Sequence, residues 1–483
     1  MRRVMLASVV GSAVALVAVA GYAVADVFDV APGILTLDRP LAAPTPTVSG
    51  TAAPVLLPEP AASVDPMLTD TGADAPAPTS AGLQRALATA SDDPALNGAT
   101  GISVRDGHTG EELWALDAAT PRVPASTQKL MASLAVADGL DLSDGMATSV
   151  VARPGSTDVV LVVRGDTLLA PGAGDPDNVA GRAGLADLAG QVAASLAPSG
   201  RTRVRLRLDL SYAPGPRYPS TWNPHDVRDG FTQAVVMTGL ATQLPRALHP
   251  SPLSPEREVA TAFVKRLKAR GVSATLLPER TWSTAAPTDA QVLGSIESAT
   301  YAEVLDFAID HSENALTENL TRQAAFAAGR STTRQGDNAR FIRERLTADG
   351  VPTAGLVITD ACGLSPGQQA SAATLSGVLR LAATGAVPEL RGVVAGLPVA
   401  GLSGTLTGRF QAKATQDVVG VPRAKTGTLR AGSSLAGTTV DADGRPLTYV
   451  LLVDGFPRTY AGTLRARAAL DRIVAALTRC GCR

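Results

Sequence analysis

The chain has 483 residues, of which 45% are hydrophobic and 18% are charged. This length is enough for two or three domains with a substantial core, and the composition is typical of a globular rather than a disordered protein. The formal net charge of −1 lacks the positive excess that nucleic-acid-binding proteins carry, so no nucleic acid is expected as a partner.

The N-terminus predicts export from the cytoplasm. Two arginines are followed by 22 uncharged residues, Val4 to Ala25. Ala23-Val24-Ala25 fits the small-x-small cleavage site of a secretory signal, whereas an uncleaved apolar helix of this length spans a bilayer and keeps the arginines inside. Residues 1–30 are therefore expected to be a signal peptide or an N-terminal membrane anchor. Both alternatives make the remaining chain extracytoplasmic, either secreted or anchored to the outer face of the cytoplasmic membrane.

A linker and then a folded region follow. Residues 31–80 contain ten prolines, which favour extended chain and cannot pack a core, so they predict a disordered linker. From about Ser80, AGLQRALATA has the apolar spacing of a helix. GATGISVRDGHTGEELWAL then predicts two short strands around a turn at Asp106 and Gly107.

Residues 146–285 predict an inserted region of mixed strand and helix. TDVVLVVRGD is expected to form a buried strand, and RTRVRLRLDLSY a half-exposed strand whose arginines face solvent. SPEREVATAFVKRLKARG predicts a helix that is capped by Ser254, with Pro255 in its first turn and Gly271 as its stop. Beyond the insertion, TYAEVLDFAIDHSENALTENLTRQAA predicts helix and PLTYVLLVDGF predicts strand.

The stretch VPASTQKLMA places Ser126 three residues before Lys129, the only one of five lysines with a serine at this offset. Pro124 predicts a helix that begins near Ala125 or Ser126, which puts both side chains on one helical face. A serine hydroxyl becomes a nucleophile when a neighbouring base takes its proton, and a lysine serves as that base when burial or a second cation lowers its pKa. The pair therefore predicts nucleophilic catalysis.

Two further short motifs supply candidate partners. Lys425-Thr426-Gly427 is the only such tripeptide, and its flanks predict a hairpin that places the lysine on a strand. Lys425 and Thr426 are suited to bind a carboxylate, and Lys425 is a candidate for the second cation beside Lys129. Ser312-x-Asn314 is the only pair of its kind. It offers a hydroxyl for proton transfer and an amide for substrate binding, although such residues alone also cap helices and form turns.

In the order Ser-x-x-Lys, Ser-x-Asn and Lys-Thr-Gly, the three motifs match those of penicillin-binding proteins and serine β-lactamases. VPASTQKLMASLA, HSENALTENL and AKTGTLRAGSSLAGTTVDADGRPL resemble the motifs of D-alanyl-D-alanine carboxypeptidases, specifically low-molecular-mass (class C) penicillin-binding proteins with a large insertion between the first two motifs. The resemblance covers about residues 80–475. Ser312 follows Lys129 by 183 positions, too many for a compact β-lactamase. One departure is Cys362 in DACGLS, where a small hydroxyl or glycine is expected.

The resemblance implies an α+β fold of the β-lactamase/penicillin-binding-protein-like transpeptidase type, an antiparallel sheet flanked by helices with an inserted mixed α/β lobe. The serine D,D-peptidase domain would comprise residues 81–145 and 286–483, and the insertion residues 146–285. No metal or cofactor is implied. The implied partners are peptidoglycan stem peptides, β-lactam antibiotics as inhibitors, and a membrane if the N-terminal segment is retained.

The family's mechanism, carried onto these positions, makes Ser126 the nucleophile, Lys129 its general base and Ser312 the proton relay to the leaving amine. The expected substrate-binding residues are Asn314 for a backbone amide, Lys425 and Thr426 for the terminal carboxylate, and Thr428, whose N–H would stabilise the oxyanion together with that of Ser126. The bond cleaved would be the terminal D-Ala-D-Ala bond, so the expected function is a serine D,D-carboxypeptidase. D,D-endopeptidase activity on cross-links is compatible with the same site.

Two other classes of function stay open. A β-lactamase or esterase would form the same acyl-enzyme and differ in how fast water attacks it; Glu313 and Glu318 lie near the second motif, but the sequence cannot aim them at that water. A non-catalytic cell-wall-binding protein would carry degraded motifs, whereas all three are intact.

Other candidate catalytic residues are set aside on physical grounds. GLSPG mimics the Gly-x-Ser-x-Gly motif of hydrolases, but Pro366 lacks the N–H which that oxyanion hole needs, and all four histidines precede Ser365. The histidines show no zinc-ligand spacing. His311, beside Ser312, is expected to have a packing role.

The three cysteines lie in a chain for which export permits disulfides. Cys480 and Cys482 are so close in sequence that mutual pairing is unfavourable for normal disulfide geometry. One of them is therefore expected to bridge to Cys362 and tie down the C-terminal tail, and the alternative is three unpaired thiols.

Overall fold

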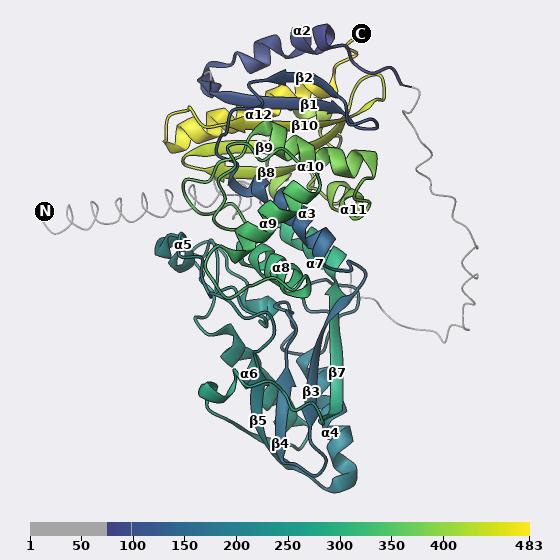
Figure 1. Cartoon of the computed structure of the whole chain (residues 1–483), viewed down its shortest axis with the longest axis vertical. Coiled ribbons are helices and arrows are strands. Elements are labelled where there is room, and N and C mark those ends of the chain that lie inside the picture. Colours follow the sequence, from purple (N-terminus) through teal and green to yellow (C-terminus); the bar gives the residue numbers. More distant parts are fainter. Residues whose placement is uncertain (1–74, 98) are drawn as a thin grey trace, which may run out of the picture.

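The computed structural model describes residues 75–97 and 99–483. The predicted signal or anchor and nearly all of the predicted linker lie outside these residues. Two five-stranded sheets occupy opposite ends of the molecule's long axis, with a cluster of helices between them (Figure 1). Within the described residues, no helix is both long enough and apolar enough to cross a membrane.

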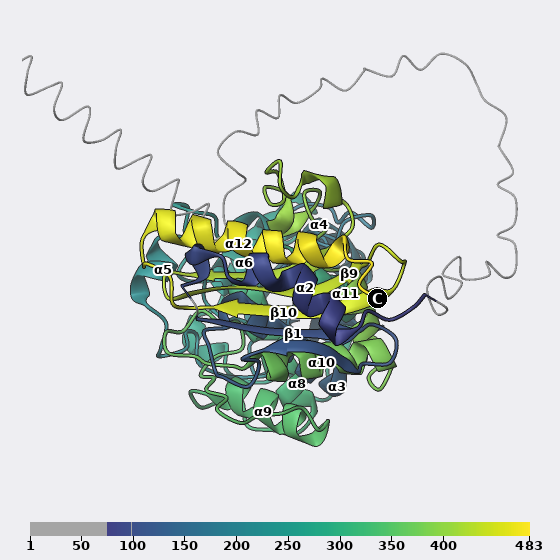
Figure 2. The ribbon, with the colours of Figure 1, turned by 90° about the horizontal axis from the view of Figure 1, so that it is seen from above.

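The first sheet is antiparallel throughout, with the strand order β2-β1-β10-β9-β8. Its central strand β10 is buried at every position but the first, because α12 and α2 cover one face and α10 covers the other (Figure 2). The predicted strand PLTYVLLV lacks polar alternation for this reason. The elements are β1 (Thr100–Asp106), β2 (Glu112–Leu116), β8 (Arg423–Leu429), β9 (Gly432–Val440), β10 (Pro446–Val453), α2 (Ser80–Ser91), α10 (Ala372–Thr384) and α12 (Tyr460–Thr478).

The helices between the sheets enclose α3 on every side. This helix packs against α8, α9, α10 and α11, and it is buried from Lys129 to Ala137. Such all-round burial requires the mostly apolar sequence KLMASLAVA rather than an amphipathic one. The helices are η2 (Ala125–Gln128, a single 3₁₀ turn), α3 (Lys129–Gly139), α7 (Tyr301–Asp310), α8 (Asn314–Ala327), α9 (Asp337–Ala348) and α11 (Glu389–Ala395).

The second sheet has the order β6-β5-β4-β3-β7 and mixes parallel with antiparallel pairs. Helices α4 and α6 connect its parallel strands and pack against each other. The arginines of β5 alternate with buried aliphatics, as the sequence pattern predicted. Arg205 also forms an exposed ion pair with Asp158. The elements are β3 (Gly145–Ala152), β4 (Asp158–Val162), β5 (Arg203–Asp209), β6 (Ser273–Leu276), β7 (Gln291–Thr300), α4 (Leu185–Leu196), α5 (Pro224–Arg228) and α6 (Pro255–Ala269).

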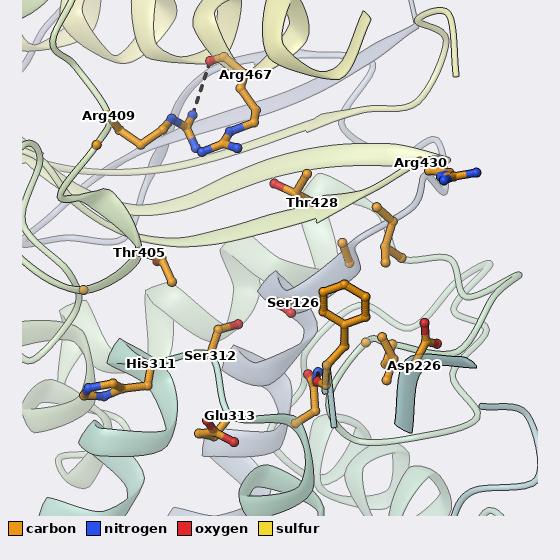
Figure 3. A pocket seen from close by; sticks show the side chains of 18 of the residues that line it. Ser126, Asp226, His311, Ser312, Glu313, Thr405, Arg409, Thr428, Arg430 and Arg467 are labelled. Carbon is orange, nitrogen blue, oxygen red and sulfur yellow. Dashed lines mark hydrogen bonds between the residues drawn. The ribbon is translucent and has the colours of Figure 1, made fainter. Parts of the chain in front are cut away.

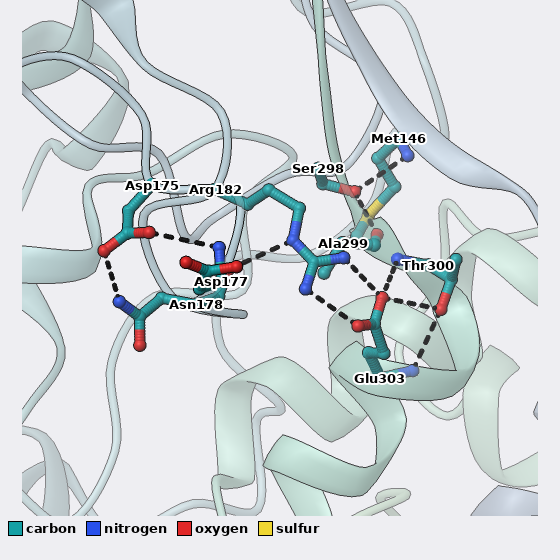
Figure 4. Close-up of polar contacts among 9 residues, drawn as sticks. All are labelled: Met146, Asp175, Asp177, Asn178, Arg182, Ser298, Ala299, Thr300 and Glu303. Carbon is teal, nitrogen blue, oxygen red and sulfur yellow. Dashed lines mark hydrogen bonds and ion pairs between the residues drawn. The ribbon is translucent and has the colours of Figure 1, made fainter. Parts of the chain in front are cut away.

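The loop before α4 is tied to the first turn of α7 (Figure 4). Arg182 donates to both carboxylate oxygens of Glu303, at 2.6 and 2.8 Å, and this contact lowers the pKa of Glu303 to about 2. The same glutamate closes a capping box with Thr300, which satisfies backbone N–H groups at the start of α7. The entry of α7 into the helical cluster is thereby fixed, and α7 leads directly to Ser312.

The predicted elements are confirmed in the described residues, from the helix at Ser80 to the strand pair around Asp106 and the hairpin after Lys425. Ser254 takes the N-cap position of α6, although its side chain makes no capping hydrogen bond, and Gly271 has φ +81° just beyond the helix.

The expectation for the cysteines is wrong. Cys480 pairs with Cys482, and Cys362 is unpaired and buried. The Cα atoms of the pair lie 5.0 Å apart, a separation that suits a disulfide even with one residue between them. Cys362 packs with Trp222 and Ala315 in a different apolar cluster from the one that contains the tail.

Candidate active site

Ser126 lies in η2, directly before α3, as the position of Pro124 predicted. The residue before it, Ala125, has φ +44°, a left-handed conformation that side chains rarely adopt. Gly363 accommodates this turn, because a Cβ at that position would lie 2.0 Å from the carbonyl oxygen of Ala125. Backbone strain of this kind persists only where the surrounding structure enforces it, and such residues cluster at functional sites.

Lys129 is fully buried, and its Nζ has three acceptors. It donates to Ser126 Oγ at 3.0 Å, to Asn314 Oδ1 at 2.7 Å and to the carbonyl oxygen of Cys362 at 2.9 Å. Burial lowers the pKa of Lys129, and nearby acidic groups oppose that shift. The cause is therefore desolvation, in place of the charge of Lys425 that the sequence suggested.

Ser312 occupies the turn between α7 and α8 and has φ +56°. Its Oγ accepts a hydrogen bond from Lys425 Nζ at 2.9 Å. Asn314 begins α8, where its Oδ1 faces Lys129 and its Nδ2 donates to the carbonyl oxygen of Phe231 at 2.9 Å. The structure thus brings the three sequence motifs into contact.

Strand β8 passes directly beside Ser126. A Cβ on Gly427 would lie 3.0 Å from the Ser126 backbone nitrogen, so glycine permits the close approach. Lys425 and Thr426 are buried, and Thr426 Oγ1 donates to Thr405 Oγ1 at 2.9 Å. The hydroxyl of Thr428 is buried and has no hydrogen-bond partner among the described residues.

Ser126, Ser312, Asn314 and Thr428 line a cleft of about 1630 Å³, and the buried Lys129, Lys425 and Thr426 are not among its lining residues. In Figure 3, Ser312 and Thr405 lie to the left of Ser126, and Asp226 and Arg430 lie to its right. Thr428 lies on the strand above Ser126. A cleft of this size has room for a peptide on both sides of the nucleophile.

A buried carboxylate that the sequence reading missed lies behind Lys129. Asp360 is 1% exposed and accepts hydrogen bonds from Trp222, Gln128, Gln368 and two backbone N–H groups. It stands in DACGLS, beside the Gly-Leu-Ser-Pro-Gly stretch whose serine is excluded as a nucleophile. The available signal was an aspartate between a strand-like run and a Gly-Leu-Ser-Pro-Gly turn, where acidic side chains often bind backbone N–H groups.

Glu318, Asp360 and Cys362 place ligand-type atoms within 4.8 Å of one another. Glu318 already accepts from the backbone N–H groups of Ala361 and Cys362 at 2.6 and 3.0 Å. Burial raises the pKa of the Cys362 thiol well above its usual value, which disfavours the thiolate that a metal would bind. The donor set fits a hydrogen-bonded turn better than a metal site.

The other candidate side chains have structural partners. Ser365 Oγ lies 2.6 Å from Thr221 Oγ1, and the Ser365 N–H donates to Asp360, which fits a turn residue. His311 stacks on Phe307 with ring centroids 4.2 Å apart, which fits the packing role.

The fold and the meeting of the three motifs at one cleft define the class of serine D,D-peptidases. The chain belongs to the D-Ala-D-Ala carboxypeptidase 3 (S13) family, Peptidase S13, whose model matches residues 83–247 and 240–477. It is a serine-type D-Ala-D-Ala carboxypeptidase, a hydrolase of the low-molecular-mass penicillin-binding-protein group, and the recognition made from the motifs is confirmed.

Curated relatives and solved structures agree. The chain is 33% identical to carboxypeptidase DacB of Mycolicibacterium smegmatis, covering 88% of this chain and 89% of the relative, and 34% identical to carboxypeptidase Rv3627c of Mycobacterium tuberculosis, covering 84% and 85%. Penicillin binding protein 4 (dacB) of Haemophilus influenzae has the same fold, with a TM-score of 0.61 at 18% identity over 82% of this chain and 99% of that one. The predicted α+β transpeptidase fold is confirmed.

Proposed function

We propose that Ser126 attacks the carbonyl carbon of the terminal D-Ala-D-Ala bond of a peptidoglycan stem peptide. The Oγ–C bond forms as the Ser126 proton passes to Lys129 Nζ, and the C–N bond to the leaving D-alanine breaks as that amine gains a proton through Ser312. Water then hydrolyses the ester and regenerates the serine. The observation that carries the proposal is the 3.0 Å contact between Lys129 Nζ and Ser126 Oγ, with Lys129 fully buried.

Substrate binding is assigned to residues of the second and third motifs. Lys425 and Thr426 bind the terminal carboxylate, and Asn314 holds a backbone amide of the stem peptide. The N–H groups of Ser126 and Thr428 stabilise the oxyanion, for which loss of one donor typically costs about 10²–10³ in rate. Ser126 and Thr428 both line the cleft, which supports this assignment.

Residues 81–145 and 286–483 are proposed as the catalytic domain and residues 146–285 as an inserted domain. Support comes from the second sheet, which occupies its own end of the molecule (Figure 1), although its strand β7 (Gln291–Thr300) follows the proposed boundary in sequence. D,D-endopeptidase activity on cross-linked stem peptides is a further part of the proposal, because the cleft extends beyond Ser312 toward α12 and leaves room for a larger leaving group.

The enzyme acts outside the cytoplasm, on the cell wall. The finer proposal is that residues 1–30 export the chain and either leave it secreted or hold it at the outer face of the cytoplasmic membrane. Intact mass of the exported protein tests these alternatives. A mature N-terminus at Asp26 is expected from signal cleavage, and retention of Arg2 and Arg3 would indicate an anchor.

Intact mass spectrometry of the purified exported region with benzylpenicillin tests the assignment of the nucleophile. A long-lived adduct is expected on the parent and none on Ser126→Ala, with Ser365→Ala as a matched serine control that still acylates. An adduct that persists on Ser126→Ala would contradict the proposal. Rapid hydrolysis of the drug without adduct would instead favour a β-lactamase on the same fold.

A further inference from the structure

Asp360 is a buried carboxylate surrounded by N–H donors. Its Oδ1 accepts from Gly363 N at 2.8 Å and from Gln368 Nε2 at 2.8 Å, and Gln128 Nε2 lies 3.2 Å away. Its Oδ2 accepts from Ser365 N at 2.7 Å and from Trp222 Nε1 at 3.0 Å. In the described part of the chain, no arginine or lysine forms an ion pair with it. Five neutral donors therefore hold this charge, an arrangement that fixes donors in place more than it adds stability.

One of these donors belongs to the peptide unit that contacts Lys129. The Gly363 N–H and the Cys362 carbonyl are parts of one planar group and point in opposite directions. Asp360 Oδ1 binds the N–H at 2.8 Å, and the carbonyl oxygen accepts from Lys129 Nζ at 2.9 Å. Asp360 and Lys129 thus bind opposite sides of the Cys362–Gly363 peptide group.

We propose that Asp360 is a positioning residue for Lys129, which orients the Cys362 carbonyl so that the lysine lone pair faces Ser126. This inference rests on the proposed roles of Ser126 and Lys129. A neutral amine keeps two N–H donors and one lone pair. When Asn314 Oδ1 and the Cys362 carbonyl accept the two N–H groups, the lone pair is left for Ser126 Oγ, the third partner of Nζ.

Two neighbours support the same peptide from other parts of the chain. Glu318, on α8, accepts from the N–H groups of Ala361 and Cys362 and so holds the preceding two residues. Trp222 comes from the segment between β5 and α6, far from Asp360 in sequence. Its indole N–H couples that segment to the orientation of the proposed base.

Removal of the Asp360 charge is expected to change the pH dependence of acylation, which a mere loss of stability would not do. The groups that act on the pKa of Lys129 are Glu313 at the N-cap of α8, Glu318 within α8, and Asp360 and Cys362 from the loop before α10. Lys425 of β8 lies on the far side of Ser312 and donates to its Oγ. Negative charge at Asp360 favours the ammonium form. Without it, the neutral base forms at lower pH, so the acid limb of the acylation profile moves to lower pH.

The test measures the second-order rate of acylation by benzylpenicillin between pH 5 and 10 for the parent, Asp360→Asn and Asp209→Asn, alongside thermal melting. Asp209 is the matched control. It is also 1% exposed, accepts from the N–H groups of Ser211 and Ala286, and lies in the second sheet. Asp360→Asn is expected to lower the plateau rate at least tenfold and to shift the acid limb downward by roughly half a pH unit or more. Asp209→Asn is expected to lower the melting temperature only.

A plateau and midpoint equal to those of Asp209→Asn would overturn the proposal. If Asp360→Asn does not fold, the same acylation measurement on Trp222→Phe tests the proposal, because this substitution removes one hydrogen-bond donor to Asp360 and keeps an aromatic ring. A two- to fivefold lower plateau with the adduct still on Ser126 is expected, and an unchanged plateau would overturn the inference. Failure of the proposed function is a separate result, namely an adduct that persists on Ser126→Ala.

Discussion

At Lys129, burial and local charge act on the pKa in opposite directions. Burial disfavours the ammonium and so favours the neutral amine that can accept the Ser126 proton. The nearby carboxyl groups favour the ammonium that forms once the proton has moved. A base in acyl transfer must first be neutral and then hold a proton until the leaving group takes it. In the proposed mechanism, the two opposing effects serve these two steps in turn.

Asp166 provides a residue-scale prediction about stability and pH. It is 2% exposed, its Oδ1 accepts a hydrogen bond from Leu168 N, and burial raises its pKa to about 7. The folded state therefore keeps a proton that the unfolded state, with a pKa of about 3.9, releases. The raised pKa of Asp166 lowers the free energy of unfolding. This loss is absent below pH 4, grows as pH rises and is complete above about pH 7.

Asp166→Asn is expected to abolish that loss. The fall in the free energy of unfolding between pH 5 and pH 8 should shrink by about 1–3 kcal/mol relative to the parent, as measured by chemical denaturation at both values. Asp209→Asn is the control, because the pKa of Asp209 is lowered and its charge is constant across this range. An equal pH dependence in the parent and Asp166→Asn would contradict the prediction.

Residues whose chemistry demands a fixed type and spacing could be predicted from the sequence. Ser126 and Lys129 needed only an offset of three on a helix, and the structure brings their atoms within 3.0 Å. For Asp360 a local turn pattern was the available signal, but that pattern does not reveal the contact with the indole of Trp222, which lies 138 positions away in sequence. The pairing of Cys480 with Cys482 was missed because separation in sequence is a poor measure of Cα distance in a tight turn.

At the scale of elements, the predicted helical stretch around the second motif is two helices. α7 ends at Asp310 and α8 begins at Asn314, with Ser312 in a left-handed conformation between them. A continuous helix would place Ser312 on the α-helical surface, whereas the break turns its hydroxyl to Lys425. The apolar periodicity on both sides hid this break from the sequence reading, and only the polar run His-Ser-Glu-Asn marked it.

Polar residues on α8 connect this element to the chain before it. Asn319 donates to the carbonyl oxygens of Gly165 and Val236, and Arg322 donates to that of Val235. All of these contacts are buried, and they satisfy carbonyl groups of irregular segments that no sheet ladder covers. Helical periodicity predicted α8 itself but not these contacts, since Asn319 and Arg322 look like a solvent-exposed face in sequence.

At the scale of the whole molecule, the chain makes a closed excursion between Lys129 and Ser312, which are 183 positions apart in sequence. The chain leaves α3 through β3 and returns through β7, and these two strands are antiparallel neighbours, with Gly145 paired to Thr300. The ends of the excursion are therefore held together by the sheet that the excursion itself builds. Because of this, Asn314 Oδ1 lies 2.7 Å from Lys129 Nζ despite the long separation in sequence.

The C-terminal tail closes the molecule at the opposite end. Cys482 O accepts from Thr79 N at 2.7 Å just before α2, and Cys480 O accepts from Ala442 N at 3.2 Å. Gly82 lets the tail approach, because a Cβ there would lie 2.5 Å from Cys482 O. The disulfide holds both carbonyls in place, so the tail joins α2 to the turn between β9 and β10.

Replacement of Cys480 and Cys482 by alanine is expected to lower the free energy of unfolding by about 1–2 kcal/mol, because a closed loop this short restricts the unfolded chain only modestly. The measurement is chemical denaturation with and without reductant. Within the described residues this is the one disulfide, so reductant should bring the parent to the variant's stability and leave the variant unchanged. Acylation of Ser126 should be equal in both proteins, since the tail lies in the apolar cluster of α2 and α12 and not at the cleft. If reductant leaves the free energy of unfolding of the parent unchanged, the prediction is wrong, and the hydrogen bonds from Thr79 and Ala442 hold the tail without the disulfide.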